Sequence, residues 1–215
     1  MSGYKWRLAQ TLEYKWWQRY LGNKDPEQYL HWKKKYWETL LQTISPYLNI
    51  SPADRIMDAG CGPAGIFIIF GQNQVVAVDP LLDKYRQLPH FDPGQYPNTS
   101  FRAIPIEQID ELAGYDVIFC LNAINHVKDI SLCYRKLSQA LKPGGTLVIS
   151  TDAHKHNFLR KLFRLIPGDM LHPVQQNIDE YLALLSDQKL ELVANILYKK
   201  ERIFDYYISI ARKPA

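Results

Sequence analysis

The spacing of apolar residues changes character along the chain at Arg55. Before this point the sequence predicts two helices, from Tyr4 to Leu21 and from Pro26 to Ser45. Gly22 suits the end of the first helix, because glycine readily adopts the left-handed conformation that terminates helices. Asp25 can cap the second helix, and the proline that follows it suits a first helical turn.

From Arg55 onward, short apolar runs alternate with helical segments, which is typical of a doubly wound α/β domain. The predicted strands are Arg55–Ala59, Val75–Asp79, Ser100–Ala103, Asp116–Leu121, Thr146–Ser150, Glu191–Lys199 and Phe204–Arg212. The predicted helices are Ala64–Phe70, Leu81–Gln87, Glu107–Leu112, Ile130–Leu141, His156–Leu165 and Ile178–Ser186. A short polar turn joins the last two strands, so we expect them to form an antiparallel hairpin.

The N-terminal fifth of the chain is rich in aromatic residues. All five tryptophans lie within the first 37 residues, at Trp6, Trp16, Trp17, Trp32 and Trp37. A chain of 215 residues can form one domain with a large core, and it is too short for two catalytic domains. We therefore divide it into an aromatic-rich helical cap or lid over residues 1–48 and one α/β domain over residues 49–215.

Composition and charge are those of an ordinary globular protein. Hydrophobic residues make up 47% and charged residues 22% of the chain, so wholesale disorder is not expected. The net charge of +4 is scattered and gives weak support for a nucleic-acid or anionic-membrane partner. Three separate cysteines argue against a disulfide framework. With neither a signal-peptide pattern nor a run of about 18 apolar residues, a cytoplasmic protein is expected.

A glycine-rich turn directly follows the first predicted strand. Asp58-Ala59-Gly60-Cys61-Gly62 leads into a predicted helix, and Asp79 ends the next strand. Such a turn lets backbone N–H groups and a helix N-terminus approach a ligand closely. Because Gly60, Gly62 and Gly65 satisfy the G-x-G-x-x-G spacing, the turn alone fits an NAD or FAD dinucleotide as well as another nucleotide cofactor.

Three observations weigh against a dinucleotide. Asp58 puts a carboxylate at the end of the strand, where it can accept from a cationic amino group but would repel a pyrophosphate. The roughly 150 residues after Gly65 hold the rest of one sheet and leave no room for the second domain that flavin enzymes of this type need. About 50 residues also precede the turn, whereas dinucleotide domains often begin near their first strand.

Four motifs occur together between Ile56 and Ser150. They are Ile56-Met57-Asp58-Ala59-Gly60-Cys61-Gly62, Val75-Val76-Ala77-Val78-Asp79, Tyr115-Asp116-Val117-Ile118 and Leu141-Lys142-Pro143-Gly144-Gly145. The set resembles class I S-adenosylmethionine-dependent methyltransferases, in the small-molecule group that includes ubiquinone and menaquinone methyltransferases. The resemblance implies an α/β, doubly wound fold with a seven-stranded, mostly parallel sheet, whose C-terminal strand is antiparallel, beside the N-terminal helical cap. S-adenosylmethionine would be the cofactor and S-adenosylhomocysteine the product.

The resemblance also implies a cofactor site. Its expected residues are Asp58, Ala59, Gly60, Cys61, Gly62, Asp79, Pro80, Ile106, Leu121 and Asn122. Asp79 would bind both ribose hydroxyls, and a carboxylate at the tip of the second strand, about 20 residues past the first glycine, suits that role. Asp58 would face the methionine portion. Each acid has a structural alternative, because it can cap the helix that follows it.

Two positions depart from the family pattern. Family members commonly carry glycine where Ala64 stands, and often an acidic residue where Pro105 stands. That acidic residue would accept from the adenine amino group, so here this contact is either missing or supplied elsewhere.

Methyl transfer depends on alignment of nucleophile and methyl group, and it needs a base only when the acceptor arrives protonated. His126, just beyond the fourth strand, is the best-placed base, and packing or capping is its alternative role. His172 lies in a helical insertion expected over residues 151–189, a segment that often covers the substrate in the family. His154 and His156 sit in a polar run and are expected in solvent. Since we find no cluster with metal-ligand spacing, we predict no metal.

The function that fits best is methyl transfer to an oxygen, nitrogen or carbon of a small, hydrophobic or aromatic acceptor. Residues 158–166 have the form of a basic interfacial helix, so membrane contact through a lipid-like substrate stays open beside ordinary helix packing. Leu121-Asn122-Ala123-Ile124 lacks the Asn/Asp-Pro-Pro-aromatic motif of amino-methylating DNA enzymes, which argues against nucleic acid. RNA or protein acceptors, and an inactive subunit that only binds the cofactor, remain alternatives.

Overall fold

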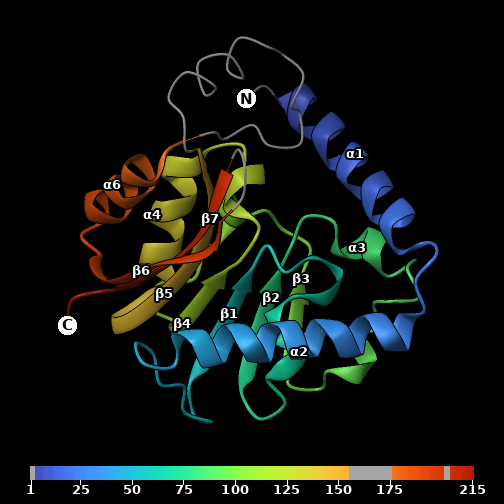
Figure 1. The fold of residues 1–215 in the computed structure, drawn as a ribbon, viewed down its shortest axis with the longest axis horizontal. Coiled ribbons are helices and arrows are strands. Elements are labelled where there is room, and N and C mark those ends of the chain that lie inside the picture. Colours follow the sequence, from blue (N-terminus) through green and yellow to red (C-terminus); the bar gives the residue numbers. More distant parts are fainter. Residues whose placement is uncertain (1–2, 155–175, 201–203) are drawn as a thin grey trace.

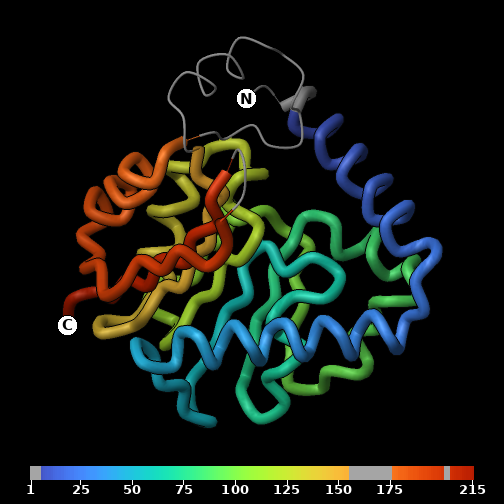
Figure 2. The backbone as a smooth tube through the Cα atoms, viewed as in Figure 1, coloured from blue at the N-terminus to red at the C-terminus, as the bar shows by residue number. Residues whose placement is uncertain are grey.

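The computed structural model describes residues 3–154, 176–200 and 204–215. Two long helices, α1 (Gly3–Leu21) and α2 (Pro26–Ile44), precede the sheet and confirm the two predicted N-terminal helices (Figure 1). Asp25 caps α2 as expected, because its side chain accepts a hydrogen bond from the Gln28 N–H at 2.9 Å. From the turn between them, the two helices diverge as the sides of a V (Figure 2).

Seven strands form one sheet with the predicted doubly wound topology. They are β1 (Arg55–Ala59), β2 (Gln74–Val78), β3 (Thr99–Arg102), β4 (Tyr115–Cys120), β5 (Leu141–His154), β6 (Glu191–Lys200) and β7 (Phe204–Arg212). The order is β3-β2-β1-β4-β5-β7-β6, and β7 runs antiparallel to both of its neighbours. The order reverses between β1 and β4, and open α/β sheets bind ligands at the carboxyl ends of strands beside such a reversal.

Three helices pack beside the strands as predicted. They are α3 (Leu82–Tyr85), which is shorter than expected, α4 (Ile130–Ala140) and α6 (Ile178–Asp187). β5 continues four residues past its expected end at Ser150, because its pairing with β7 extends to His154 opposite Phe204. The helix predicted over His156–Leu165 lies outside the described residues.

Two predicted helices are wrong in type. The segment Ala64–Phe70 forms two 3-10 turns, Gly62–Ala64 and Ile66–Ile69, and Glu107–Leu112 is replaced by a 3-10 turn over Ile106–Gln108. Gly65 has extended ψ and separates the first two turns, and the isoleucines that follow it are weak helix formers. Further 3-10 turns span Pro93–Gln95 and Ile124–His126.

The two faces of the sheet bury separate cores. On one face Leu40 of α2 packs with Ile56 and Phe67, and on the other α4 packs with Met57 of β1. Ile56 and Met57 point to opposite faces because side chains alternate along a strand. Burial of a side chain such as Leu40 stabilises the fold by about 1.5–3 kcal/mol. These cores hold β1, β2 and β4 rigidly, and their carboxyl ends form the floor of the site.

Candidate functional site

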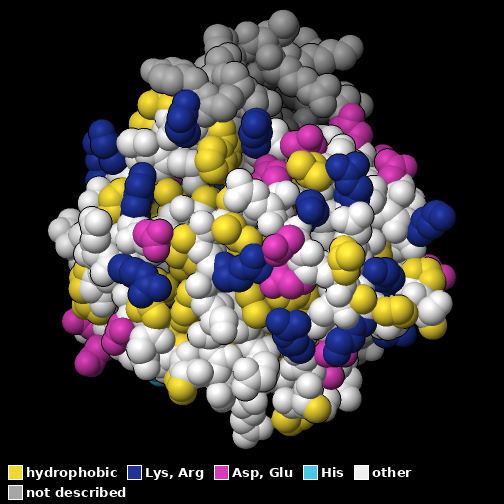
Figure 3. All heavy atoms as spheres, turned by 180° about the vertical axis from the view of Figure 1, so that it is seen from behind, with side chains coloured by type: hydrophobic (Ala, Val, Ile, Leu, Met, Phe, Trp, Pro, Cys, Tyr) yellow, Lys and Arg dark blue, Asp and Glu magenta, His cyan; other side chains and the backbone are white. Residues whose placement is uncertain are grey.

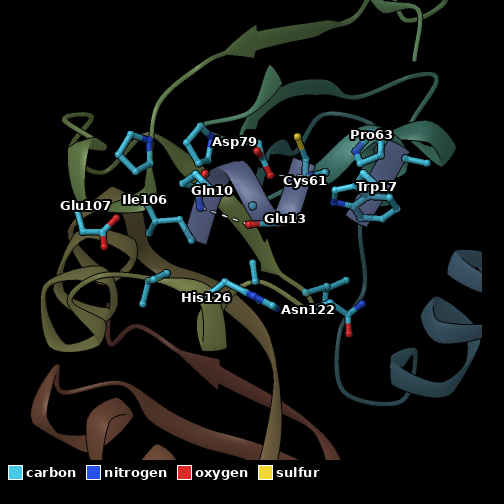
Figure 4. A pocket seen from close by; sticks show the side chains of 18 of the residues that line it. Gln10, Glu13, Trp17, Cys61, Pro63, Asp79, Ile106, Glu107, Asn122 and His126 are labelled. Atoms are coloured by element: carbon cyan, nitrogen blue, oxygen red, sulfur yellow. Dashed lines mark hydrogen bonds between the residues drawn. The ribbon is translucent and has the colours of Figure 1, made fainter. Parts of the chain in front are cut away.

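A cavity of about 120 Å³ lies at the carboxyl ends of β1, β2 and β4, with α1 and α2 contributing to its wall (Figure 4). From the sheet side it is lined by Gly60, Cys61, Gly62, Pro63, Ala64, Asp79, Pro80, Pro105, Ile106, Glu107, Leu121, Asn122, Ala123, His126 and Val127. From the N-terminal helices it is lined by Trp6, Gln10, Glu13, Trp17, Lys33 and Trp37. Small-molecule sites commonly enclose about 300–1,000 Å³. The side chains of α1 therefore fill part of the space that a nucleotide cofactor needs.

The glycine turn has no free N–H group to offer between Gly60 and Gly62. The amides of Gly60 and Cys61 both donate to the Val78 carbonyl, at 2.8 and 3.1 Å, and the Gly62 amide donates to Asp79 at 3.0 Å. A 3-10 turn, rather than an α-helix, follows. The amide donors and the helix dipole that bind a pyrophosphate in dinucleotide folds are thus missing from this turn.

Asp58 does not line the cavity, contrary to the expectation that it faces the cofactor. Its side chain is 2% exposed and accepts a hydrogen bond from the Phe67 N–H at 3.0 Å, so it anchors the Ile66–Ile69 turn. Burial raises the pKa of Asp58 to about 7. Asp58 lies on β1 with its carboxylate behind the glycine turn. Its contacts are those of the alternative role, a cap for the turn that follows. Ala59, the next residue, is likewise absent from the cavity wall.

Asp79 combines a structural role with a place in the cavity wall. One carboxylate oxygen accepts from the Leu81 N–H at 2.8 Å, and the other accepts from the Gly62 N–H. Burial raises the pKa of Asp79 above its ordinary value, and the two backbone donors oppose that shift. The carboxylate therefore holds the glycine turn to the end of β2 and still borders the cavity.

Helix α1 brings a second acid to Asp79. Glu13 lines the cavity and interacts electrostatically with Asp79, while Gln10 donates to Glu13 at 3.3 Å. The amide oxygen of Gln10, Oε1, is buried and has no hydrogen-bond partner. Trp17 packs edge-on against Tyr85 of α3 at 6.3 Å, which docks α1 on the domain. Apart from the clustered tryptophans, no local pattern marked these α1 residues as part of a site.

Helix α2 brings one basic side chain, Lys33. Its ammonium lies 4.2 Å from the centre of the Trp37 ring, and the Trp37 indole donates to the Ala64 carbonyl at 3.0 Å. Burial lowers the pKa of Lys33 to about 8, against the opposing attraction of Asp58. Lys33 was not among the residues expected in the cofactor site.

The remaining expected residues divide into two groups, and one unexpected residue joins them. Gly60, Cys61, Gly62, Asp79, Pro80, Ile106, Leu121 and Asn122 line the cavity, and so does the candidate base His126. His156 and His172 lie outside the described residues. His154, which was expected in solvent, is instead buried and packs beside the Phe204 ring, because β5 extends to pair with β7. Glu107, which was not expected, borders the cavity but accepts from the Lys128 and Asp129 amides at 2.8 and 3.1 Å.

Two further findings apply to the described residues, 3–154, 176–200 and 204–215. Within them, no group of three or more metal-ligating side chains comes together. Within them also, none of the helices combines the length and the apolar character needed to cross a membrane.

The pairing of Glu13 with Asp79 predicts a dependence of stability on pH. Burial, together with the Asp79 carboxylate, raises the pKa of Glu13 from 4.5 to about 8. The folded state thus binds this proton more tightly than the unfolded chain, so the stabilisation is fully present below pH 4.5 and is lost as pH rises through 8. We expect Glu13→Gln, which stays neutral, to show a shallower fall in the free energy of unfolding between pH 5 and 9.

Denaturant unfolding across that pH range measures the effect. Asp58 and Asp79 titrate with the same sign in both proteins, so the slope should decrease without reaching zero. Glu38→Gln, at an exposed position of α2, is the matched control. Identical pH profiles for wild type and Glu13→Gln would show that Glu13 is solvated and that α1 does not dock as described.

Comparison with known proteins gives a consistent picture. A family model described as a methyltransferase domain matches residues 29–192. The ubiquinone biosynthesis O-methyltransferase of Bradyrhizobium sp. (strain ORS 278) is 32% identical over 109 residues, covering 48% of this chain and 42% of that protein. The tRNA U34 carboxymethyltransferase of Pseudoalteromonas atlantica is 27% identical over 133 residues, covering 59% and 38%. This chain therefore matches less than half the length of either relative.

Solved structures share the fold. The magnesium protoporphyrin IX methyltransferase of Synechocystis PCC 6803, solved with S-adenosylhomocysteine bound, superposes with a TM-score of 0.66. It covers 94% of this chain and 94% of its own, at 19% identity. At that identity, the likeness establishes the shared fold alone.

Proposed function

We propose, from the premise that this chain belongs to the methyltransferase-domain family, that it transfers a methyl group from S-adenosylmethionine to a small acceptor molecule. The observation that carries the proposal is the cavity at the β1/β4 reversal. Asp79 and Glu13 both line this cavity, and the amides of the glycine turn are already hydrogen-bonded within the protein. This arrangement suits a ligand with hydroxyl and amino groups and no phosphate. A dinucleotide would set its pyrophosphate against the Asp79 carboxylate.

The residues present fit the adenosine portion of S-adenosylmethionine. Asp79 and Glu13 offer carboxylate oxygens to the ribose hydroxyls, and Pro80 and Ile106 offer apolar surface to the adenine ring. The buried Gln10 Oε1, which has no partner, can accept from the adenine amino group. Gln10 would thereby supply the contact that Pro105 cannot make.

The methionine portion would extend along the glycine turn toward α2. Lys33 is the one Lys or Arg among the described residues that line the cavity, and its ammonium suits the methionyl carboxylate. The side chain of Asn122 and the turn at Gly60 border the same end. This placement keeps the cationic lysine apart from Glu13 and Asp79, which lie at the ribose end.

When bound, S-adenosylmethionine supplies an electrophilic methyl group on a cationic sulfur, and the acceptor's lone pair displaces S-adenosylhomocysteine from it. The chain's own contribution is to orient both partners and to exclude water with the aromatic side chains of α1 and α2. Where the acceptor arrives protonated, His126 borders the cavity and is the candidate to take that proton. Because α1 fills part of the cavity, we infer that it acts as a lid that shifts when the cofactor enters.

Two observations favour a small acceptor over RNA. The relatives named for ubiquinone biosynthesis and for magnesium protoporphyrin act on small, largely hydrophobic molecules by their names. On the face seen in Figure 3, acidic and basic side chains of the described residues are interspersed. Nucleic-acid-binding proteins gather basic residues on one face, and the face in Figure 3 is not such a face.

The test is to incubate the purified protein with S-adenosylmethionine carrying a labelled methyl group and an extract of its host. We expect label in an organic-soluble product, unchanged by prior nuclease treatment of the extract. Nuclease-sensitive label would overturn the small-molecule proposal in favour of RNA, and label in protein would favour a protein acceptor. Calorimetry with S-adenosylhomocysteine and NAD completes the test, because NAD binding without S-adenosylhomocysteine binding would overturn the cofactor assignment itself.

A further inference from the structure

Four side chains gather beyond the methionine end of the cavity, and we refer to them as the acid site: Lys33, Tyr36, Lys199 and Tyr206. The ammonium of Lys33 lies 5.2 Å and that of Lys199 lies 5.3 Å from the centre of the same Tyr36 ring. Lys199 also lies 5.8 Å from the Tyr206 ring. The residues come from α2, β6 and β7, so only the tertiary fold brings them together.

The two lysines form a concentration of positive charge. Lys199 contributes to the lowered pKa of Lys33, after the larger effect of burial. Among the described residues, neither ammonium group has a carboxylate within the 4.0 Å of an ion pair. Like charges held near each other disfavour the folded state unless an anion offsets them. Asp58 attracts the Lys33 ammonium more strongly than Lys199 repels it, so Lys199 is the cation of this group that favours a negatively charged ligand.

Tyr206 supplies an unsatisfied hydrogen-bonding group at the same place. Its side chain is 6% exposed, and its hydroxyl completes no hydrogen bond of normal geometry, although it lies beside Tyr36 and Ser150. An unpaired buried hydroxyl is unfavourable by about 1–3 kcal/mol, so such groups are rare unless a ligand or water completes them. The hydroxyl can donate to an anionic oxygen.

The acid site is continuous with the proposed methyl-transfer site. Lys33 belongs to both, because it also lines the cavity. Tyr36 interacts with Asn122, which borders the methionine end of that cavity, and Ser150 accepts from the Asn122 N–H at 2.7 Å. A molecule held at Tyr36 and Lys199 would therefore lie next to the methionine end, where an acceptor must stand.

We propose that the acid site binds the carboxylate of the methyl acceptor, so that the acceptor is an aromatic or similarly flat organic acid. Lys199 and Tyr206 would hold the carboxylate, and the ring of Tyr36 would pack against the acceptor's apolar body. This inference rests on the proposed function. The methionyl carboxylate of the cofactor is a second carboxylate that these side chains could bind. Lys33 belongs to the acid site and to the cavity wall, so it lies near the positions of both carboxylates.

Calorimetry with benzoate and with neutral benzyl alcohol, in the presence of saturating S-adenosylhomocysteine, tests the proposal. We expect benzoate to bind about 10-fold or more tightly than benzyl alcohol, and Lys199→Gln to abolish that preference. Lys200→Gln, at the exposed neighbouring position of β6, should keep it. Equal binding of the two probes to wild type, or an unchanged preference in Lys199→Gln, would overturn the proposal.

Tyr206→Phe separates binding from folding. Because the hydroxyl has no partner, its removal should leave the free energy of unfolding unchanged or higher, while benzoate affinity falls about 5-fold. Unaltered benzoate affinity in this variant would remove Tyr206 from the site.

Affinity for S-adenosylhomocysteine, measured alone, distinguishes the two sources of carboxylate. Lys199→Gln should not change it, whereas Lys33→Gln should lower it and leave the affinity for 5′-methylthioadenosine, which lacks the methionyl carboxylate, unchanged. If Lys199→Gln lowers S-adenosylhomocysteine affinity instead of benzoate affinity, the acid site serves the cofactor and the acceptor assignment is overturned. Failure of wild type to bind S-adenosylhomocysteine at all would contradict the proposed function separately.

Discussion

Replacement of Asp79 by alanine should weaken the binding of S-adenosylhomocysteine by about 5- to 150-fold, which corresponds to the loss of about 1–3 kcal/mol from hydrogen bonds to a charged group. The reason is its position at the carboxyl end of β2, where it borders the cavity and carries a full or partial negative charge. Two other described acids, Glu13 and Asp58, interact electrostatically with Asp79, and of these two only Glu13 lines the cavity. Calorimetric titration of the folded variant measures the change.

A loss of affinity in Asp79→Ala must be distinguished from a loss of structure in the glycine turn. Asp79 also accepts from the Gly62 and Leu81 amides, so alanine leaves two N–H groups without their partner. Asp79→Asn keeps one carboxamide oxygen for these donors and removes the charge, and it should therefore lose affinity with a smaller loss of stability. Asp83→Ala, at the exposed start of α3, is the control and should bind as wild type does. A stable Asp79→Ala variant with wild-type affinity would exclude Asp79 from the cofactor site.

The fold was predictable because its determinants are local. Alternating apolar runs located all seven strands, and Asp25 and Gly22 marked the helix boundary, since caps and strand patterns depend on neighbours in sequence. The motif around Gly60 and the acid at Asp79 then indicated the family, which the match over residues 29–192 confirms. The roles of individual residues in the cofactor site stay predictions.

The walls of the cavity were not predictable in the same way. Glu13 lies 66 positions before Asp79 in the sequence, and Lys33 lies on the face of α2 that packs on the domain, in line with Tyr29 and Trp37. Their residue types carry no signature, because a glutamate or lysine on a helix is ordinarily a solvated side chain. The four-residue spacing of Tyr29, Lys33 and Trp37 places Lys33 on the buried face of α2 and Lys34 off that face, whereas no spacing links Glu13 to Asp79.

Asp58 lies in the predicted motif, and its contacts in the structure are those of a cap. The argument that its carboxylate would repel a pyrophosphate assumed that it faces the ligand, whereas it caps the turn at Phe67. The case against a dinucleotide also rests on other residues, because the Asp79 carboxylate borders the cavity and the turn amides are already bonded. Contact of Asp58 with the cofactor stays a prediction.

Gly60→Ala should destabilise the protein by about 2–5 kcal/mol and eliminate measurable cofactor binding, from about 1–2 kcal/mol of left-handed backbone strain and about 1–3 kcal/mol of overpacking. Gly60 has φ +78°, and a Cβ built there would lie 2.2 Å from the Cβ of Ala123. Relief requires the loop after β4 to move, and this loop carries Asn122 and His126 into the cavity. Denaturant unfolding and calorimetry measure the two effects.

The same geometry supplies a control and a partial rescue. Gly71→Ala should stay close to wild type, because nothing lies within 4 Å of its Cβ position and its backbone is not left-handed. In Gly60→Ala combined with Ala123→Gly, the clashing methyl group is gone while the backbone strain remains. The double variant should therefore recover about 1–3 kcal/mol, the overpacking part of the loss. Stability of Gly60→Ala equal to that of Gly71→Ala would mean that the turn does not pack against Ala123, and the described floor of the cavity would be wrong.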